Sequence, residues 1–514
     1  MRRSLARAVR LALLMSAAVA TPVVGQEGGS GEPRPARTIR AVDDSLATLI
    51  EAADERLARG QVARAVEEYR RAQQMLGLHL LYGEADRFYY EESARIHAGL
   101  ARAYLETGDP FAARIEASRG LNLTEDDAGL WTLLGSARYR LTETEDAEWA
   151  FRRALELDPD RAEAHWGLAL VAVASNRIDL ARRHGGEAVQ LDPRARYALG
   201  LARWAAIVND HPAATEALDD YLRWIDGGSA PGYRNLRRFY AWVAEAPANR
   251  VDPRVRRAQI NFDLKRGDEI PYVPVRFNGG EVAYVLFDTG AEFNVVDRRF
   301  ARSIGVDTIV PGGGLRGAYR RSPGGYTLVD SLEIGSFRIQ RVPFSVADFE
   351  ALNLRGQGSY YIAAVINPAL LFRDFRVVID FRHRRIELER YGAGGRGRRL
   401  AGRSTTRPFR FDANGVWPVI PVRLDGSSPL PFLLDTGSSD VVVERETANV
   451  LRLDPRRLHA RTDGFAAPNL RAVLHDGSLG EPWGVRLHGI LGFPFFRNMR
   501  VAFDYRTMTL ELSE

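Results

Sequence analysis

The stretch that decides the fold is YVLFDTGA, residues 284–291, together with PFLLDTGS, residues 431–438. In both, an apolar run leads into Asp-Thr-Gly and a small residue follows it. The two stretches align without gaps at a step of 147 residues, and so do PVRF, 274–277, and PVRL, 421–424. One Asp-Thr-Gly arises easily by chance, whereas two in matched positions of a duplicated segment do not. The C-terminal half is therefore predicted to contain two copies of one unit.

The duplicated half is predicted to be all β. Val- and Phe-rich alternating runs separated by Gly and Asn extend from about residue 258 to the end of the sequence. We expect lobe 1 at 258–391, a Gly-rich linker at 392–407 and lobe 2 at 408–514. Both copies end in a similar strand. The matched residues of these final strands are 124 positions apart instead of 147, so the second copy lacks about 23 residues. The matched Asp380 and Asp504 are interpreted as strand-end or turn residues lying after the last core strand.

On these residues the C-terminal half resembles the aspartic proteases, specifically the retropepsin-like group with Asp-Thr-Gly-Ala or Asp-Thr-Gly-Ser loops. The resemblance covers roughly residues 258–514 and implies a two-lobed fold in which one chain supplies both halves. It implies that Asp288 and Asp435 are the catalytic pair. Two carboxyls about 3 Å apart cannot both ionise easily, so they share one proton. The ionised member activates a water and the protonated member polarises the scissile carbonyl, without metal or cofactor.

The resemblance also gives roles to the neighbours of the two aspartates. The threonines are expected to hydrogen-bond across between the loops, and the glycines to permit the tight turn. These supporting residues are Thr289, Gly290, Thr436 and Gly437.

Two further features of the family can be sought in the sequence. An apolar-apolar-Gly segment packs beside each catalytic loop, and lobe 2 has it as GILG, 489–492. In lobe 1 the segment reads VINP, 365–368, and Pro368 is taken to replace the glycine, which weakens the expectation of full activity. A substrate-covering flap is sought in the Gly-rich stretch 311–325, with Tyr319 and Tyr326 nearby. An ordinary long loop is an equal interpretation of that stretch.

The region 41–245 is predicted to be a helical solenoid. It is rich in Ala, Leu, Arg and Glu and repeats every 34 residues, as Leu100, Leu134 and Leu168 show. The period and the small residues at fixed positions resemble the tetratricopeptide repeat. The resemblance implies a stack of helical hairpins that binds a protein partner, the substrate or another copy of the chain.

Composition narrows the function classes. Of 514 residues, 45% are hydrophobic and 27% charged, which is typical of globular proteins with more than one domain. There is no cysteine, so disulfides, thiolate catalysis and Cys-ligated zinc are excluded. The net charge of +5 comes from arginines interleaved with acids, which gives no support to nucleic-acid binding. We find no HExxH pattern and no phosphate-binding loop, and we expect no metal.

The N-terminus predicts export. A basic head, a short apolar run (11–20) and Ala18-Val19-Ala20 form the layout of a signal peptide, residues 1–25. A flexible leader is expected at 26–40, and no stable membrane span after cleavage. The sequence thus predicts a periplasmic or secreted aspartic endopeptidase that acts on proteins or peptides. The alternative is a repeat-based adaptor whose β half binds peptides without hydrolysing them.

Overall fold

The computed structural model of the chain describes residues 34–82, 86–224, 231–264, 270–306, 309–312, 315–316, 321–352, 361–392, 400, 404–462, 465–477, 479 and 484–513. The chain divides into two compact units, residues 1–137 and 138–514, which are described in turn. The predicted signal peptide lies outside the described residues. None of the helices described is both long and apolar enough to cross a membrane.

The first unit consists of antiparallel helix pairs. Its helices are α2 (Arg34–Ala58), α3 (Val62–Tyr82), α4 (Arg87–Glu106), α5 (Pro110–Leu121) and α6 (Ala128–Arg140). Helix α2 packs on α3 and α4 on α5, and α3 also packs on α4, as expected for stacked hairpins. Helix α2 begins inside the segment for which a flexible leader was expected.

A close approach at Gly99 sets the spacing of α3 and α4. A Cβ there would lie 2.2 Å from Cζ of Tyr69, so only glycine lets the buried ring reach the backbone of α4. Two repeats later, a Cβ on Gly167 would lie 2.3 Å from the ring of Phe151. The packing of an aromatic ring on a glycine thus occurs in two of the helix pairs.

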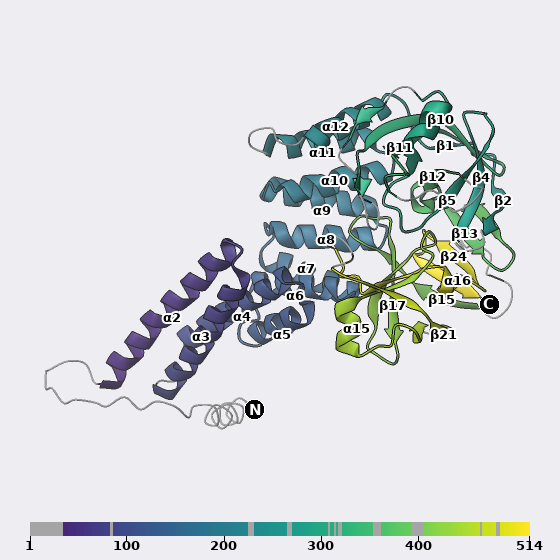
Figure 1. The fold of residues 1–514 in the computed structure, drawn as a ribbon. Coiled ribbons are helices and arrows are strands. Elements are labelled where there is room, and N and C mark those ends of the chain that lie inside the picture. Colours follow the sequence, from purple (N-terminus) through teal and green to yellow (C-terminus); the bar gives the residue numbers. More distant parts are fainter. Residues whose placement is uncertain are drawn as a thin grey trace. The chain divides into compact units, whose positions relative to one another are not determined.

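The second unit begins with the remaining helix pairs. These are α7 (Thr144–Leu157), α8 (Ala162–Ala174), α9 (Ile178–Leu191), α10 (Ala195–Ile207), α11 (His211–Trp224) and α12 (Pro231–Val243). Figure 1 shows α8 to α12 stacked in order beside the strands of this unit. Helix α8 is apolar almost all round and every residue from Trp166 to Ala174 is buried, because it has neighbours on several sides.

Lobe 1 is built on a nine-stranded sheet of order β1-β11-β6-β12-β5-β4-β10-β7, with β3 paired to β4. Strands β12 and β5 are parallel, and β12 is antiparallel to β6. The strands and helices are β1 (Arg250–Val251), β2 (Arg257–Asn261), β3 (Asp263–Leu264), β4 (Pro271–Phe277), β5 (Val282–Phe287), β6 (Val295–Asp297), α13 (Arg298–Ser303), β7 (Val310–Pro311), β8 (Leu315–Arg316), β9 (Arg321–Ser322), β10 (Gly325–Ile334), β11 (Phe337–Ala347), β12 (Ile362–Ile366), α14 (Pro368–Leu371), β13 (Phe375–Asp380) and β14 (Arg385–Arg390).

Lobe 2 repeats this topology in shorter form. In its eight-stranded sheet, β18 and β23 are parallel and β23 is antiparallel to β19, which matches β5, β12 and β6 of lobe 1. The elements are β15 (Ser404–Pro408), β16 (Arg410–Phe411), β17 (Pro418–Leu424), β18 (Leu430–Leu434), β19 (Val441–Glu444), α15 (Arg445–Leu451), β20 (Leu458–Thr462), β21 (Phe465–Leu470), β22 (Ala472–His475), β23 (Gly489–Leu491), α16 (Phe493–Phe496), β24 (Arg500–Asp504) and β25 (Thr509–Ser513). Strand β15 occupies the end of the expected linker.

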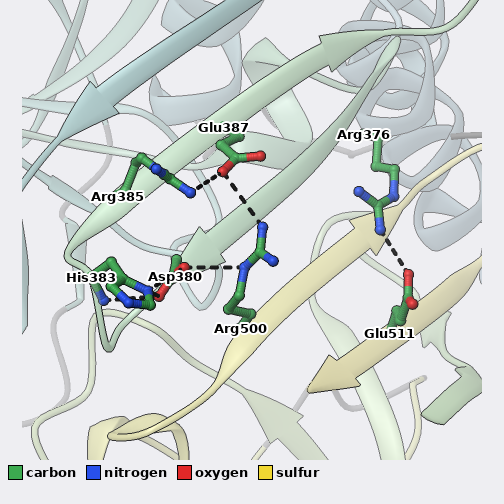
Figure 2. A network of polar contacts seen from close by, with 7 residues as sticks. All are labelled: Arg376, Asp380, His383, Arg385, Glu387, Arg500 and Glu511. Atoms are coloured by element: carbon green, nitrogen blue, oxygen red, sulfur yellow. Dashed lines mark hydrogen bonds and ion pairs between the residues drawn. The ribbon is translucent and has the colours of Figure 1, made fainter. Parts of the chain in front are cut away.

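A six-stranded sheet of order β15-β25-β24-β13-β14-β2 joins the two lobes, each giving three strands. Matched ion pairs cross it in both directions (Figure 2): Arg376 contacts Glu511 at 2.7 Å, and Arg500 contacts Glu387 at 3.5 Å. Asp380 ends β13 and contacts Arg500 at 3.1 Å. The strand-end interpretation of Asp380 and Asp504 is confirmed, but their position after the last core strand is wrong. Strands β14 and β25 follow and complete the joining sheet.

The helices of the second unit share a core with both lobes. Buried Trp204 on α10 donates from its indole nitrogen to the carbonyl of Ala413 at 3.0 Å, and Asn176 donates to the carbonyl of Tyr505 at 2.9 Å. Arg373 of lobe 1 donates to the Asn176 side chain and to the carbonyl of Gly415, the latter at 2.6 Å. Burial lowers the pKa of Arg373 to about 10.

Candidate active site

Each lobe places its aspartate at the end of a buried parallel strand. Strand β5 ends at Phe287 and Asp288 follows, with its backbone N–H donating to the carbonyl of Ile366 at 2.9 Å. In lobe 2, the N–H of Asp435 donates to the carbonyl of Leu491 at 3.0 Å. The two loops are thus presented by the same three-strand arrangement.

The threonines tie the two loops together. The N–H of Thr289 donates to Oγ1 of Thr436, and the N–H of Thr436 donates to Oγ1 of Thr289, each at 3.1 Å. Each hydroxyl donates in turn to the carbonyl that precedes the opposite aspartate, Leu434 or Phe287, at 2.7 Å. Both threonines are buried, so these four bonds fix the register of the loops without competition from water.

The glycines lie directly against the opposite carboxyl. A Cβ on Gly290 would lie 2.4 Å from Cγ of Asp435, and one on Gly437 would lie 2.4 Å from Cγ of Asp288. Any larger residue would push the carboxyls apart. The structure therefore brings together all six of the residues that the sequence placed in the two loops.

The two carboxyls form one coupled pair that stays partly open to solvent. Oδ1 of Asp288 accepts the N–H groups of Gly290 at 2.7 Å and Ala291 at 3.0 Å, while Oδ1 of Asp435 accepts that of Gly437 at 2.8 Å. Burial raises the pKa of both aspartates, and the charge and hydrogen bond of Asp288 raise the pKa of Asp435 further. One proton is therefore shared by the pair.

The support of the lobe 1 loop differs from the sequence prediction. Since Ile366 and Leu491 hold the same position beside their aspartates, Asn367, not Pro368, stands where lobe 2 has Gly492. Pro368 matches Phe493 and opens the short helix α14, where a missing N–H is tolerated. The alignment slipped because lobe 1 has one more residue than lobe 2 between this point and the arginine of the joining sheet.

Asn367 replaces the bond that Pro368 cannot make. In lobe 2, the N–H of Phe493 donates to the carbonyl of Ser438, next to the catalytic loop, at 2.8 Å. In lobe 1, Nδ2 of the fully buried Asn367 donates to the carbonyl of Ala291, the residue that matches Ser438, at 2.5 Å. Its Oδ1 accepts the N–H of Ala369 at 2.7 Å. The lobe 1 loop thus receives a hydrogen bond at the same place as its counterpart.

Another matched pair of acids was not predicted from the sequence. Asp297 and Glu444 end β6 and β19, are buried, and lie 147 residues apart. Asp297 accepts the N–H groups that begin α13 and that of Phe349. Glu444 accepts bonds from Thr447 and Arg486. The step of 147 residues that aligned the Asp-Thr-Gly loops would have revealed this pair. Its two acids fix the ends of β6 and β19, the strands that follow the loops.

The expected flap is described only in part. Tyr319 lies outside the described residues, while β8 and β9 pair as a short hairpin on either side of that gap. Tyr326 is the second residue of the long strand β10, and its ring stacks on Phe239 of helix α12 with centroids 5.2 Å apart. Tyr326 therefore marks the base of the candidate flap and contacts the helical region.

Comparison with known families agrees with this geometry. A family model described as "Aspartyl protease" matches residues 273–362 and 420–495, one segment in each lobe. The C-terminal part is an aspartyl-protease-like domain. No group of three His, Cys, Asp or Glu side chains suited to a metal ion is found among the residues described.

Solved structures with similarity to the chain contain tetratricopeptide-like helices. One, on pilF of Pseudomonas aeruginosa, gives 21% identity and TM-score 0.33 over 40% of this chain and 86% of that one. A MamA protein gives 18% identity and TM-score 0.27 over 35% and 91%. A mutant O-GlcNAc transferase of Thermobaculum terrenum gives 25% and 0.25 over 26% of each chain. None of the curated proteins compared with the chain matches it. The helical repeats are assigned from their own packing.

Proposed function

We propose that the protein is an exported aspartic endopeptidase that hydrolyses peptide bonds with a water held between Asp288 and Asp435. The observation that carries the proposal is the pair itself: two partly accessible carboxyls, locked together by four buried threonine bonds, with raised pKa values. Two carboxyls held this close together retain one proton between them. A catalytic pair needs that state.

The arrangement supports a balanced sequence of proton transfers. Ionised Asp288 takes a proton from the water as its oxygen attacks the scissile carbonyl carbon, and Asp435 gives its proton to the carbonyl oxygen. This produces a neutral geminal diol. Asp288 then protonates the amide nitrogen while a diol hydroxyl returns a proton to Asp435. The C–N bond breaks and releases an acid and an amine, and the pair is restored.

The test is cleavage of a diverse peptide mixture from pH 3 to 8, read by mass spectrometry. Asp288→Asn and Asp435→Asn are run beside Asp330→Asn, which changes an exposed aspartate on β10. The proposal expects cleavage by the wild type and by Asp330→Asn, and loss of cleavage in both loop variants. Folded wild-type protein that cleaves nothing at any pH would instead favour the non-hydrolysing peptide-binding adaptor.

The helical repeats are proposed to recruit the protein that is cut, or a partner. Support comes from α5, where Phe111 and Ile115 lie one turn apart and are 49% and 48% exposed. We expect the double variant Phe111→Ser/Ile115→Ser to cleave short peptides normally and to cut folded protein substrates more slowly. Equal rates on both substrate types would remove recruitment from the proposal.

Export belongs to the proposal because of the basic head and apolar run in residues 1–25. A mature chain that begins near residue 26 in the periplasmic or extracellular fraction is the expected result of N-terminal sequencing. An intact N-terminus in the cytoplasm would contradict it.

A further inference from the structure

A pocket outside the carboxyl pair lies where the helical region meets lobe 1. Its walls come from α10 to α12 and from the chain that leaves the Asp288 loop, and it holds about 680 Å³ of space that no protein atom fills, part of it open to solvent. Arg203 and Phe239 lie in the helical wall, and Glu292 and Tyr326 lie in the wall that lobe 1 supplies.

The pocket is continuous with the machinery of the protease domain. Glu292 is the fourth residue after Asp288, and the neighbouring Asn294 accepts the N–H of Asn367 at 3.0 Å, the residue that supports the catalytic loop. Tyr326 follows directly on Gly325, the end of the candidate flap. The pocket therefore borders both segments of lobe 1 between which a peptide substrate would lie.

The lining favours an uncharged, flat group. The stacked rings of Phe239 and Tyr326 lie with their planes 21° apart, and Tyr240 and Phe293 add further aromatic surface. Arg203 and Glu292 are the charged residues of the lining, and they pair with each other at 2.6 Å, which cancels most of their field. Burial lowers the pKa of the lining His211 to about 4, so it too is neutral at neutral pH.

Polar groups at the edge add a second preference. Four asparagine side chains belong to the lining, and an amide among them can bond the polar tip of a phenol or an indole that lies against the aromatic wall. Aromatic side chains with a polar tip combine a large apolar area with such a bond.

We propose that this pocket binds an aromatic side chain of the peptide substrate, so that helices α10 to α12 set the sequence specificity of the protease domain. The inference rests on the proposed endopeptidase function. It gives the helical region a direct part in choosing the peptide, in addition to any recruitment.

The test fills the pocket and measures the preference for an aromatic residue. Ala206 on α10 lines the pocket and is partly buried, so Ala206→Phe places a ring inside it. Ala63→Phe adds the same ring to an exposed position of α3 and serves as the matched control. A second variant, Phe239→Leu, removes an aromatic wall while keeping apolar bulk. Circular dichroism and thermal melting verify that each variant is folded.

The measurement has two arms. In the first, kcat/KM is compared for peptide pairs with Tyr or Ala at the position that a randomised library shows to be enriched in aromatics. We expect Ala206→Phe and Phe239→Leu to lower the Tyr/Ala ratio about tenfold, and Ala63→Phe to leave it as in the wild type. In the second, the immobilised Asp288→Asn protein selects peptides from the same library, and the aromatic enrichment is expected to vanish when Ala206→Phe is added.

The arms separate the two proposals. Cleavage without aromatic preference, or with a preference that survives Ala206→Phe, overturns the pocket and leaves the peptidase standing. Aromatic enrichment in the binding arm that Ala206→Phe abolishes, with no cleavage by the wild type, supports the pocket and overturns the peptidase. Absence of both cleavage and aromatic enrichment overturns both.

Discussion

The two lobes hold their Asp-Thr-Gly loops by different chemistry. In lobe 2 the loop is supported by a backbone bond from Phe493, and Gly492 is required because a Cβ would lie 2.2 Å from the carbonyl oxygen of Asp440. In lobe 1 a side chain, Asn367, makes the equivalent bond and a proline follows it. Both lobes thus have a hydrogen-bond donor at this place, which is a backbone N–H in lobe 2 and a side-chain amide in lobe 1. A change that looks damaging in sequence is compensated by the residue before it.

The largest effect on catalysis should come from replacing either aspartate of the pair. Either Asp288→Asn or Asp435→Asn is expected to lower kcat by about 10²- to 10⁴-fold, because each carboxyl performs a different proton transfer in the same step. Single-turnover assays on one peptide would measure it. If one variant kept near wild-type activity, the lobes would not act as a pair.

The threonine hydrogen bonds of the two lobes should contribute equally to the free energy of unfolding. Thr289→Val and Thr436→Val each leave one buried carbonyl and one buried N–H without a partner, at about 1–3 kcal/mol per group. Chemical denaturation is expected to show the same loss of unfolding free energy for both. The double variant should lose less than the sum, because the threonines share one network. An additive result would contradict the shared network.

The role of Asn367 can be tested by giving lobe 1 the residues that lobe 2 has at the matching positions. Asn367→Gly should cost about 1–3 kcal/mol and slow catalysis severalfold, because the Ala291 carbonyl loses its donor while Pro368 still offers none. Adding Pro368→Phe restores a backbone N–H in the lobe 2 pattern and should recover most of the loss. Denaturation and kcat of the two variants measure this. A double variant no better than the single one would show that the lobes are not interchangeable here.

The smallest expected effect concerns pH and stability. Because the folded pKa of Asp435 is raised, the folded chain binds more protons than the unfolded chain, and its stability falls as pH rises through the folded pKa. Asp435→Asn removes that ionisation, so its melting temperature should exceed that of the wild type at neutral pH. The difference should shrink toward acid pH, below the ordinary range of an aspartate. A constant difference across the pH range would contradict the raised pKa.

Much of the architecture is visible in sequence because duplication leaves fixed steps. The step of 147 aligned both loops, and the period of 34 located the helical pairs. One strand from each lobe in the joining sheet keeps the step too, since β15 lies 147 residues after β2 along its whole length. The support of loop 1 was misassigned because a single added residue in α14 shifts the alignment, and only the hydrogen bonds to Asp288 and Asp435 reveal it.

The packing of helices on lobes could not be predicted. It depends on contacts between residues hundreds of positions apart, such as Trp204 with Ala413 and Asn176 with Tyr505. No periodicity or motif encodes them. The aromatic pocket was missed for the same reason, since neither the helices nor lobe 1 forms it alone.

Arg373 links three parts of the second unit. Its buried guanidinium bonds a helix-pair turn through Asn176 and lobe 2 through Gly415, and lies over the Phe411 ring at 4.9 Å. Pulling any one of the three parts away would leave a buried cation without its acceptors, which costs more than the separated surfaces alone. Helices α7 to α12 and both lobes should therefore melt in one calorimetric transition. A chain shortened to begin at residue 250 would lose the surface against which its own protease domain is folded.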